Sequence, residues 1–222
     1  MENHVVKVLK SYYVTYDVKC FVVEKPEGYD FIPGQAANIS INLPEWKDQL
    51  RAFSFTSLNE DNYLEFMIKI YMDHEGVTNM LGGINVGDEL ILHDIFGAIH
   101  YKGPGIFIAG GSGITPFISI FRDLHKKQLL GGNRLIYSNK TSEDVIMKEE
   151  LQVMLKSNFV NLLTRENVMG FIGRRIDRNF LIENIADFGQ HFYICGSTEF
   201  VANITEYLLD LGVTPDSLVI EK

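Results

Sequence analysis

A glycine-rich turn within residues 105–120 holds the residues whose types and spacing best fit a chemical role. The sequence GIFIAGGSGITPFISI passes from an apolar run through Gly110, Gly111 and Gly113 into Thr115 and a proline. Glycines let backbone N–H groups approach a phosphate, and a helix N-terminus beginning at a proline favours negative charge. The segment predicts a strand, a turn and a helix start that hold a pyrophosphate, although an ordinary strand-to-helix turn has the same pattern.

Length and composition narrow the class of protein. With 222 residues, the chain is long enough for two small domains. A formal charge of −9 argues against nonspecific binding to nucleic acid or to an anionic membrane, since both need a basic surface. Cys20 and Cys195 are too few for the four thiolates of an iron–sulfur cluster, and the six histidines are scattered, so no metal site is predicted. The first residues carry no apolar signal core, and we expect a cytoplasmic protein.

Two periodicities divide the chain. Short alternating runs punctuated by proline and glycine predict an antiparallel β-barrel over residues 1–102. Apolar strands alternating with helices predict a Rossmann-like parallel sheet, covered on both faces, over residues 103–222. The expected strands are 5–10, 12–18, 20–24, 36–43, 51–57, 63–71, 88–95, 105–110, 134–138, 159–164, 191–196 and 217–221, and the expected helices start near 76, 115, 145 and 198.

A second motif lies in the barrel half, where RAFSFTS at 51–57 follows Pro33-Gly34-Gln35. Together with the glycine turn, it resembles the ferredoxin–NADP reductase superfamily, whose flavin domain carries an R-x-Y/F-S-x-x-S strand and whose nucleotide domain carries an A-G-G-x-G-I-T-P turn. Further matches follow in family order: GVTNML at 76–81, YSNKTSEDVIMKEEL at 137–151, GRRID at 173–177 and YICGS at 193–197.

The resemblance implies an FAD site in the barrel. Arg51 would pair with the flavin pyrophosphate, Phe53 would pack along the flavin, and Ser54 would hydrogen-bond near its reactive nitrogen. Strict alternation places Ser54 on the opposite face from Phe53, so its role requires the strand to bend or end there. The other residues expected at the FAD are Ser57, Lys69, Ile70, Gly76, Val77 and Thr78.

For the second half, the resemblance implies an NAD(P) site. Thr115 and the Cys195-Gly196 pair would lie beside the nicotinamide, and a serine, Ser197, stands where the family usually has a proline. The adenosine ribose would lie near Ser138 and Lys140. No acidic residue ends that strand and Lys140 suits a 2′-phosphate, so NADPH is preferred, with NADH as the alternative.

The resemblance also implies the activity: a flavin-dependent NAD(P)H oxidoreductase that passes electrons to a separate acceptor. Ser54, Cys195 and Glu221 are the expected catalytic residues, although no aromatic follows Glu221 as it often does in the family. The first expected acceptor is ferredoxin or flavodoxin, and an oxygenase component is another. Two alternatives stay open: a stand-alone flavin or ferric reductase, and a flavin-binding electron-transfer subunit without NAD(P)H activity.

Overall fold

The computed structural model describes residues 3–97 and 99–220, and the chain divides into two compact units. The first comprises Met1–His100 with Thr115–Asp123, and the second comprises Tyr101–Ile114 with Leu124–Lys222. Most of helix α2 (Thr115–Lys126), which directly follows the glycine turn, therefore packs with the first unit.

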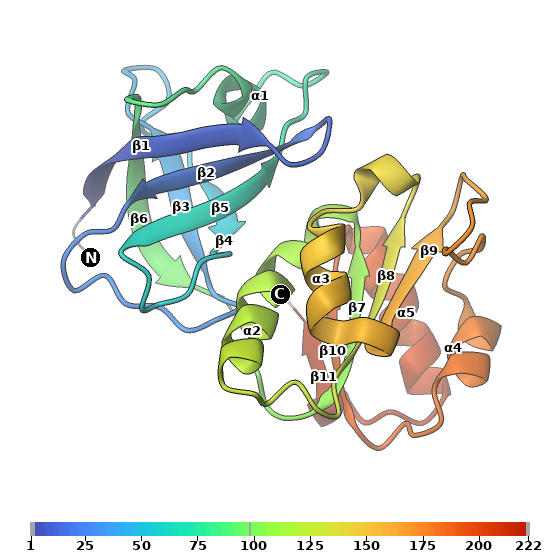
Figure 1. The fold of residues 1–222 in the computed structure, drawn as a ribbon. Coiled ribbons are helices and arrows are strands. Elements are labelled where there is room, and N and C mark those ends of the chain that lie inside the picture. Colours follow the sequence, from blue (N-terminus) through green and yellow to red (C-terminus); the bar gives the residue numbers. More distant parts are fainter. Residues whose placement is uncertain (1–2, 98, 221–222) are drawn as a thin grey trace. The chain divides into compact units, whose positions relative to one another are not determined.

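Within the described part of the first unit, an antiparallel sheet has six strands in the order β4-β3-β6-β1-β2-β5 (Figure 1). Their bounds are β1 His4–Tyr13, β2 Val18–Glu24, β3 Ala36–Ile41, β4 Arg51–Ser54, β5 Tyr63–Lys69 and β6 Glu89–Phe96. A bridge between Phe55, just after β4, and Phe66 on β5 joins the two ends of this order. The sheet thus curls into the expected barrel.

Aromatic side chains fill the barrel. Phe31 and Phe55 stack with ring centroids 4.0 Å apart, and Phe66 lies against Phe55 at 5.0 Å. Strands β2 and β5 are buried on both faces, because Phe21 and Phe66 point into the core while the alternate residues face the other way and are also covered.

Helix α1 (Val77–Gly82) is short, and a buried lysine fixes its C-terminal end. The Lys19 ammonium on β2 donates to the carbonyls of Gly82 at 2.9 Å and Ile84 at 2.7 Å. A cation that bonds the last carbonyls of a helix also complements the helix dipole. Burial lowers the pKa of Lys19.

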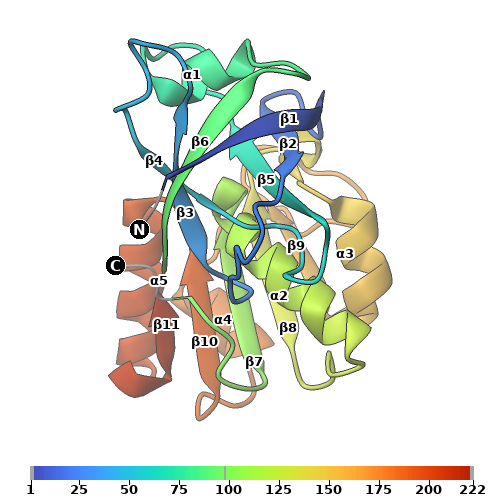
Figure 2. The same cartoon turned by 90° about the vertical axis from the view of Figure 1, so that its left-hand side faces the viewer.

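The second unit contains a parallel sheet, and its described residues form five strands in the order β11-β10-β7-β8-β9. The strands are β7 Gly105–Gly110, β8 Arg134–Asn139, β9 Phe159–Leu163, β10 His191–Cys195 and β11 Leu218–Ile220. Helix α3 (Lys148–Leu155) covers one face, while α4 (Arg178–Asn184) and α5 (Thr198–Asp210) cover the other (Figure 2). Phe180 of α4 and Ile204 of α5 pack against Ile108 and Ile194 of the sheet. The expected fold class, a β-barrel plus a Rossmann-like α/β sheet, is confirmed.

Several element bounds differ from expectation. The strand expected over residues 12–18 breaks after Tyr13, because the Thr15 hydroxyl accepts the N–H of Val18 at 3.0 Å and closes a turn. Helix α4 was not expected. It has seven residues, too few for a clear helical period, and Asp177 caps it by accepting the Phe180 N–H at 2.7 Å.

The described residues contain neither a membrane-spanning helix nor a cluster of metal-ligating side chains. Over residues 3–97 and 99–220, no helix is long and apolar enough to cross a membrane. The same residues contain no group of three or more His, Cys, Asp or Glu side chains that could hold a metal ion.

Candidate functional site

The strand order of the parallel sheet reverses between β7 and β10. From β7 the chain continues to β8 and β9 on one side, and β10 and β11 lie on the other side. In open parallel sheets, ligands bind outside the carboxyl ends of the strands at such a reversal. Gly110 ends β7 and is followed by Gly111 and Gly113, while Cys195 ends β10 and is followed by Gly196. The structure therefore brings both predicted segments to this point.

The glycines of the turn differ in their surroundings. A Cβ added at Gly113 would lie 2.4 Å from the carbonyl oxygen of Cys195, so only glycine fits there. Gly111 has φ +55°, and a Cβ on it would meet nothing within 4 Å, while its carbonyl accepts the Tyr137 hydroxyl at 2.9 Å. An open backbone surface at the end of a strand leaves room for a phosphate to approach closely. The turn fits the predicted dinucleotide.

Ser197, the departure from the family pattern, caps helix α5. Its hydroxyl accepts the N–H of Phe200 at 3.3 Å. The Phe200 ring then lies over the two glycines at the strand ends, because an added Cβ would approach it to 3.1 Å at Gly110 and to 2.7 Å at Gly196. Sequence reasoning missed Phe200, and the only signal was its position three residues after a capping serine.

Polar and charged groups meet at the carboxyl end of β8. Ser138 is half-buried and Lys140 is exposed. The Lys140 carbonyl accepts the N–H of Arg165 at 2.9 Å. This backbone bond places Arg165, a second cationic residue, next to Lys140. The Glu166 carboxylate accepts the N–H of Ser142 at 2.6 Å. Arg165 was not predicted, because its place beside Lys140 follows from the pairing of β8 with β9.

In the barrel, β4 ends at Ser54. The role expected for Ser54 required the strand to bend or end at this residue, and the structure meets that requirement. Phe53 is partly buried against the core, and Phe55 returns fully to the core. The Arg51 guanidinium is exposed and donates to the carbonyl of its neighbour Leu50 at 2.7 Å.

The remaining residues expected near FAD have mixed positions. Ser57 is buried, and its hydroxyl accepts the Glu65 N–H at 3.0 Å. Lys69 pairs with Asp17 at 2.7 Å. Ile70 and Val77 are buried, Thr78 is half-buried, and a Cβ on Gly76 would face open space.

A buried ion pair adjoins the end of β4, and sequence reasoning did not find it. The Glu65 carboxylate accepts from Arg122 at 2.6 Å and from the Thr56 hydroxyl at 2.7 Å, and Arg122 also donates to the Thr56 carbonyl at 2.7 Å. Glu65 is 7% exposed. The available signal was a glutamate within the apolar run at residues 63–71, since buried carboxylates are almost always paired.

The Cys20 thiol lies in the same surroundings. Burial, and then the Glu65 charge, raise the pKa of Cys20 to about 12. A hydrogen bond with Cys20 raises the pKa of the Tyr12 hydroxyl. Cys20 therefore stays protonated at neutral pH, which makes it a packing residue rather than a nucleophile.

Two protein-family models match consecutive parts of the chain. Residues 5–101 match the oxidoreductase FAD-binding domain, and residues 107–206 match the oxidoreductase NAD-binding domain. Over the whole chain, the fold is similar to a ferredoxin NADP+ reductase from Neisseria gonorrhoeae with bound FAD and NADP, with a TM-score of 0.88 at 22% identity, covering 100% of this chain and 98% of the other. The chain belongs to the ferredoxin–NADP reductase superfamily.

Curated members of this superfamily include longer proteins. The reductase component of propane 2-monooxygenase from Rhodococcus jostii is 27% identical over 89% of this chain, and the match spans 57% of its own length. NADH-cytochrome b5 reductase 1 from Eremothecium gossypii is 27% identical over 81% of this chain and 68% of its own length. The chain thus spans little more than half of the first of these relatives.

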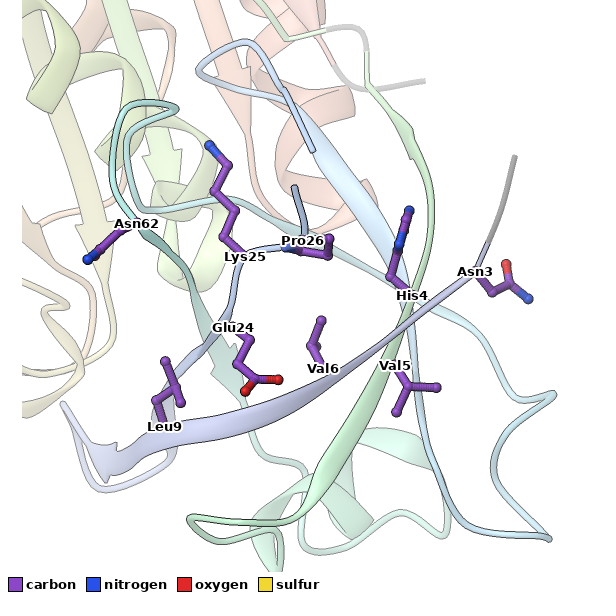
Figure 3. Close-up of a pocket in the computed structure, with 9 residues that line it drawn as sticks. All are labelled: Asn3, His4, Val5, Val6, Leu9, Glu24, Lys25, Pro26 and Asn62. Carbon is purple, nitrogen blue, oxygen red and sulfur yellow. The ribbon is translucent and has the colours of Figure 1, made fainter. Parts of the chain in front are cut away.

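For this superfamily member, one expected site residue is not described by the structure, and one cavity lies apart from the predicted site. Glu221, an expected catalytic residue, is outside the described residues. A cavity of about 540 Å³ opens between the start of β1 and the segment that ends β2 (Figure 3). Its lining contains none of the residues predicted to bind a cofactor and consists of Asn3, His4, Val5, Val6, Leu9, Glu24, Lys25, Pro26 and Asn62.

Proposed function

We propose that this chain is an FAD-dependent NAD(P)H oxidoreductase that passes electrons to a separate protein acceptor. The observation that carries the proposal is the glycine turn at the reversal of strand order, where Gly111 faces open space and Gly113 closely contacts Cys195. Bound FAD would accept a hydride and release electrons singly. The residues of the chain would bind the two cofactors, orient them and exclude water.

The barrel residues are proposed to hold FAD. The exposed Arg51 guanidinium donates to the carbonyl of the neighbouring Leu50, a partner that it can exchange for a stronger, charge-assisted bond to a phosphate. Phe53 would pack along the flavin, and Ser54, at the strand end, would donate or accept near its reactive edge. Gly76 and Thr78 are proposed at the pyrophosphate, and Lys69 and Ile70 on the adenosine side.

The second unit is proposed to bind NADPH in preference to NADH. Lys140 and Arg165 supply two cations at the carboxyl end of β8, where the adenosine ribose is expected. Charge-assisted bonds to a 2′-phosphate favour NADPH. Glu166 would favour an unphosphorylated ribose, but its carboxylate already accepts the Ser142 N–H.

The proposed acceptor is a small redox protein of the ferredoxin or flavodoxin type. An oxygenase component is a second candidate, because relatives include a propane 2-monooxygenase reductase component and a toluate 1,2-dioxygenase electron transfer component from Pseudomonas putida. The sequence supplies two cysteines, so it cannot hold a cluster of four thiolates by itself.

An anaerobic titration of the FAD-loaded protein with NADPH, and separately with NADH, tests the proposal through the visible absorbance of the flavin. We expect bleaching by NADPH at lower concentration than by NADH. Bound FAD that neither nucleotide bleaches would instead support an electron-transfer subunit. A different result would support a stand-alone flavin reductase: flavin that separates from the protein on gel filtration, yet is reduced by NADPH or NADH when the protein is present.

A further inference from the structure

The end of β4 is held by one buried carboxylate. The Thr56 N–H donates to the Glu65 carbonyl at 2.8 Å, and the Thr56 hydroxyl donates to the Glu65 carboxylate at 2.7 Å. The hydroxyl of the next residue, Ser57, accepts the Glu65 N–H at 3.0 Å. Thr56 and Ser57 are almost fully buried. Thr56 and Ser57, the second and third residues after the half-buried Ser54, are therefore fixed to a single position on β5.

Helix α2 completes this arrangement through Arg122. Its guanidinium donates to the Glu65 carboxylate at 2.6 Å and to the Thr56 carbonyl at 2.7 Å. One cation thus bonds both the carboxylate and the backbone that the carboxylate holds. Because a charge as buried as that of Glu65 requires a partner, removing Arg122 would leave it uncompensated beside the strand end.

The same helix contacts the chain on the other side of β4. The Ser119 hydroxyl of α2 accepts the N–H of Gly34 at 3.0 Å. The neighbouring Gln35 carbonyl accepts the N–H of Phe55 at 3.0 Å. Helix α2 is therefore bonded directly to Thr56 and, through the loop at Gly34 and Gln35, to Phe55. These contacts all lie within the first unit.

We propose that Arg122 and Glu65 are positioning residues that set the end of β4, and with it Ser54, relative to helix α2, which begins at Thr115. The inference rests on the proposed role of Ser54 at the flavin and on the place expected for Thr115 beside the nicotinamide. Arg122 lies seven residues after Thr115, about two helical turns. A shift of the pair would change the distance between the two reacting rings without removing a group that contacts either cofactor.

The test uses Arg122→Gln and Glu65→Gln in the full chain, with the double variant. Near-attack geometry is sensitive to small displacements, so we expect the limiting rate of flavin reduction to fall about ten- to a hundredfold in each single variant. The dissociation constant for NADPH should change less than about twofold, because the binding groups remain. The visible circular dichroism of bound FAD should change in both variants, and the double variant should lose no more than the worse single one, because both remove the same contact.

Arg134→Gln is the matched control. Arg134 also donates a guanidinium bond to a partly buried backbone carbonyl, that of Asn184, but in the second unit. It should leave the flavin dichroism and the limiting rate unchanged. Arg122→Lys, which keeps the charge, should recover part of the rate. If Arg122→Gln does not fold, the nearly isosteric Glu65→Gln carries the test.

Lower thermal stability with an unchanged dichroism spectrum and an unchanged limiting rate would overturn the inference and leave the pair a purely structural role. Failure of the proposed function is a separate result. In that case, the unmodified protein would bind no FAD or would not be reduced, whatever the variants do.

Discussion

The backbone of Gly113 lies against the carbonyl of Cys195, so that a Cβ on Gly113 would lie 2.4 Å from that oxygen. The contact joins the carboxyl ends of β7 and β10, where the strand order reverses. The glycine turn and the cysteine-glycine pair, far apart in sequence, therefore form one continuous surface in the second unit. Substitutions at this contact should affect nucleotide binding directly.

Gly113→Ala is expected to destabilise the protein by about 1–3 kcal/mol, because the methyl group has no space. The turn must move, and we expect the dissociation constant for NADPH to rise at least about tenfold. Urea unfolding and nucleotide titration measure the two effects. Gly131→Ala is the control, because a Cβ at Gly131 meets nothing within 4 Å. Equal NADPH affinities for the two variants would contradict a binding role for the turn.

Arg51→Ala is expected to weaken FAD retention about ten- to a hundredfold, the loss of roughly 1.5–3 kcal/mol that a charged hydrogen bond contributes. The residue is exposed, so folding stability should be nearly unchanged. Fluorescence titration of the apoprotein with FAD gives the dissociation constant. Lys47→Ala removes the same charge from the exposed segment before β4 and should have no effect. Unchanged FAD affinity in Arg51→Ala would remove Arg51 from the pyrophosphate site.

Lys140→Ala and Arg165→Ala should each raise the dissociation constant for NADPH about three- to tenfold while leaving that for NADH within about twofold. The reason is that only NADPH carries the 2′-phosphate. Parallel titrations with both nucleotides measure the ratio. Lys102→Ala is the control, because Lys102 precedes β7 and so lies at the amino edge of the sheet. A loss shared equally by both nucleotides would place the two cations elsewhere than at the phosphate.

Most of the fold was predictable from sequence because its signals are local. Alternating runs and glycine turns gave the barrel, and the apolar run before Gly110 gave the central parallel strand. The sequence did not predict that β4 ends at Ser54, because the alternation of side chains continues through Phe55. Where the strand ends depends on Gln35, in the loop before β3, and on Glu65 of β5, whose carbonyls accept the N–H groups of Phe55 and Thr56.

The missed parts depend on tertiary contacts. Arg122 was visible only as a basic residue late in a helix, and Glu65 as a carboxylate in an apolar run; their pairing at 2.6 Å requires helix α2 to pack on β5. Similarly, Ser197 was seen as a departure from the family pattern, whereas its function as a helix cap became clear from its bond to Phe200.

The buried Cys20 thiol predicts how stability changes at alkaline pH. Its pKa is raised from 9.0 to about 12 in the folded protein. Below pH 9 the thiol is protonated in both states and its contribution to stability is fully present. Between pH 9 and 12 the unfolded chain loses this proton while the folded protein keeps it, so the free energy of unfolding should fall by about 1.4 kcal/mol for each pH unit from this group.

Urea unfolding between pH 8 and 11 measures how the free energy of unfolding changes with pH. In Cys20→Ala this slope should be shallower by the contribution of one ionising group. The variant should also be less stable at pH 8, because it loses a small buried group. Tyrosines away from Cys20 with raised pKa, such as Tyr29 at about 12, add their own slope in both proteins. Because the hydrogen bond with Cys20 also raises the pKa of Tyr12, the difference between the two proteins measures the Cys20–Tyr12 pair. The same pKa predicts slow reaction of Cys20 with thiol reagents in the native protein. Identical alkaline slopes for the two proteins would mean that the thiol ionises in the folded state, which its position beside the Glu65 carboxylate should prevent.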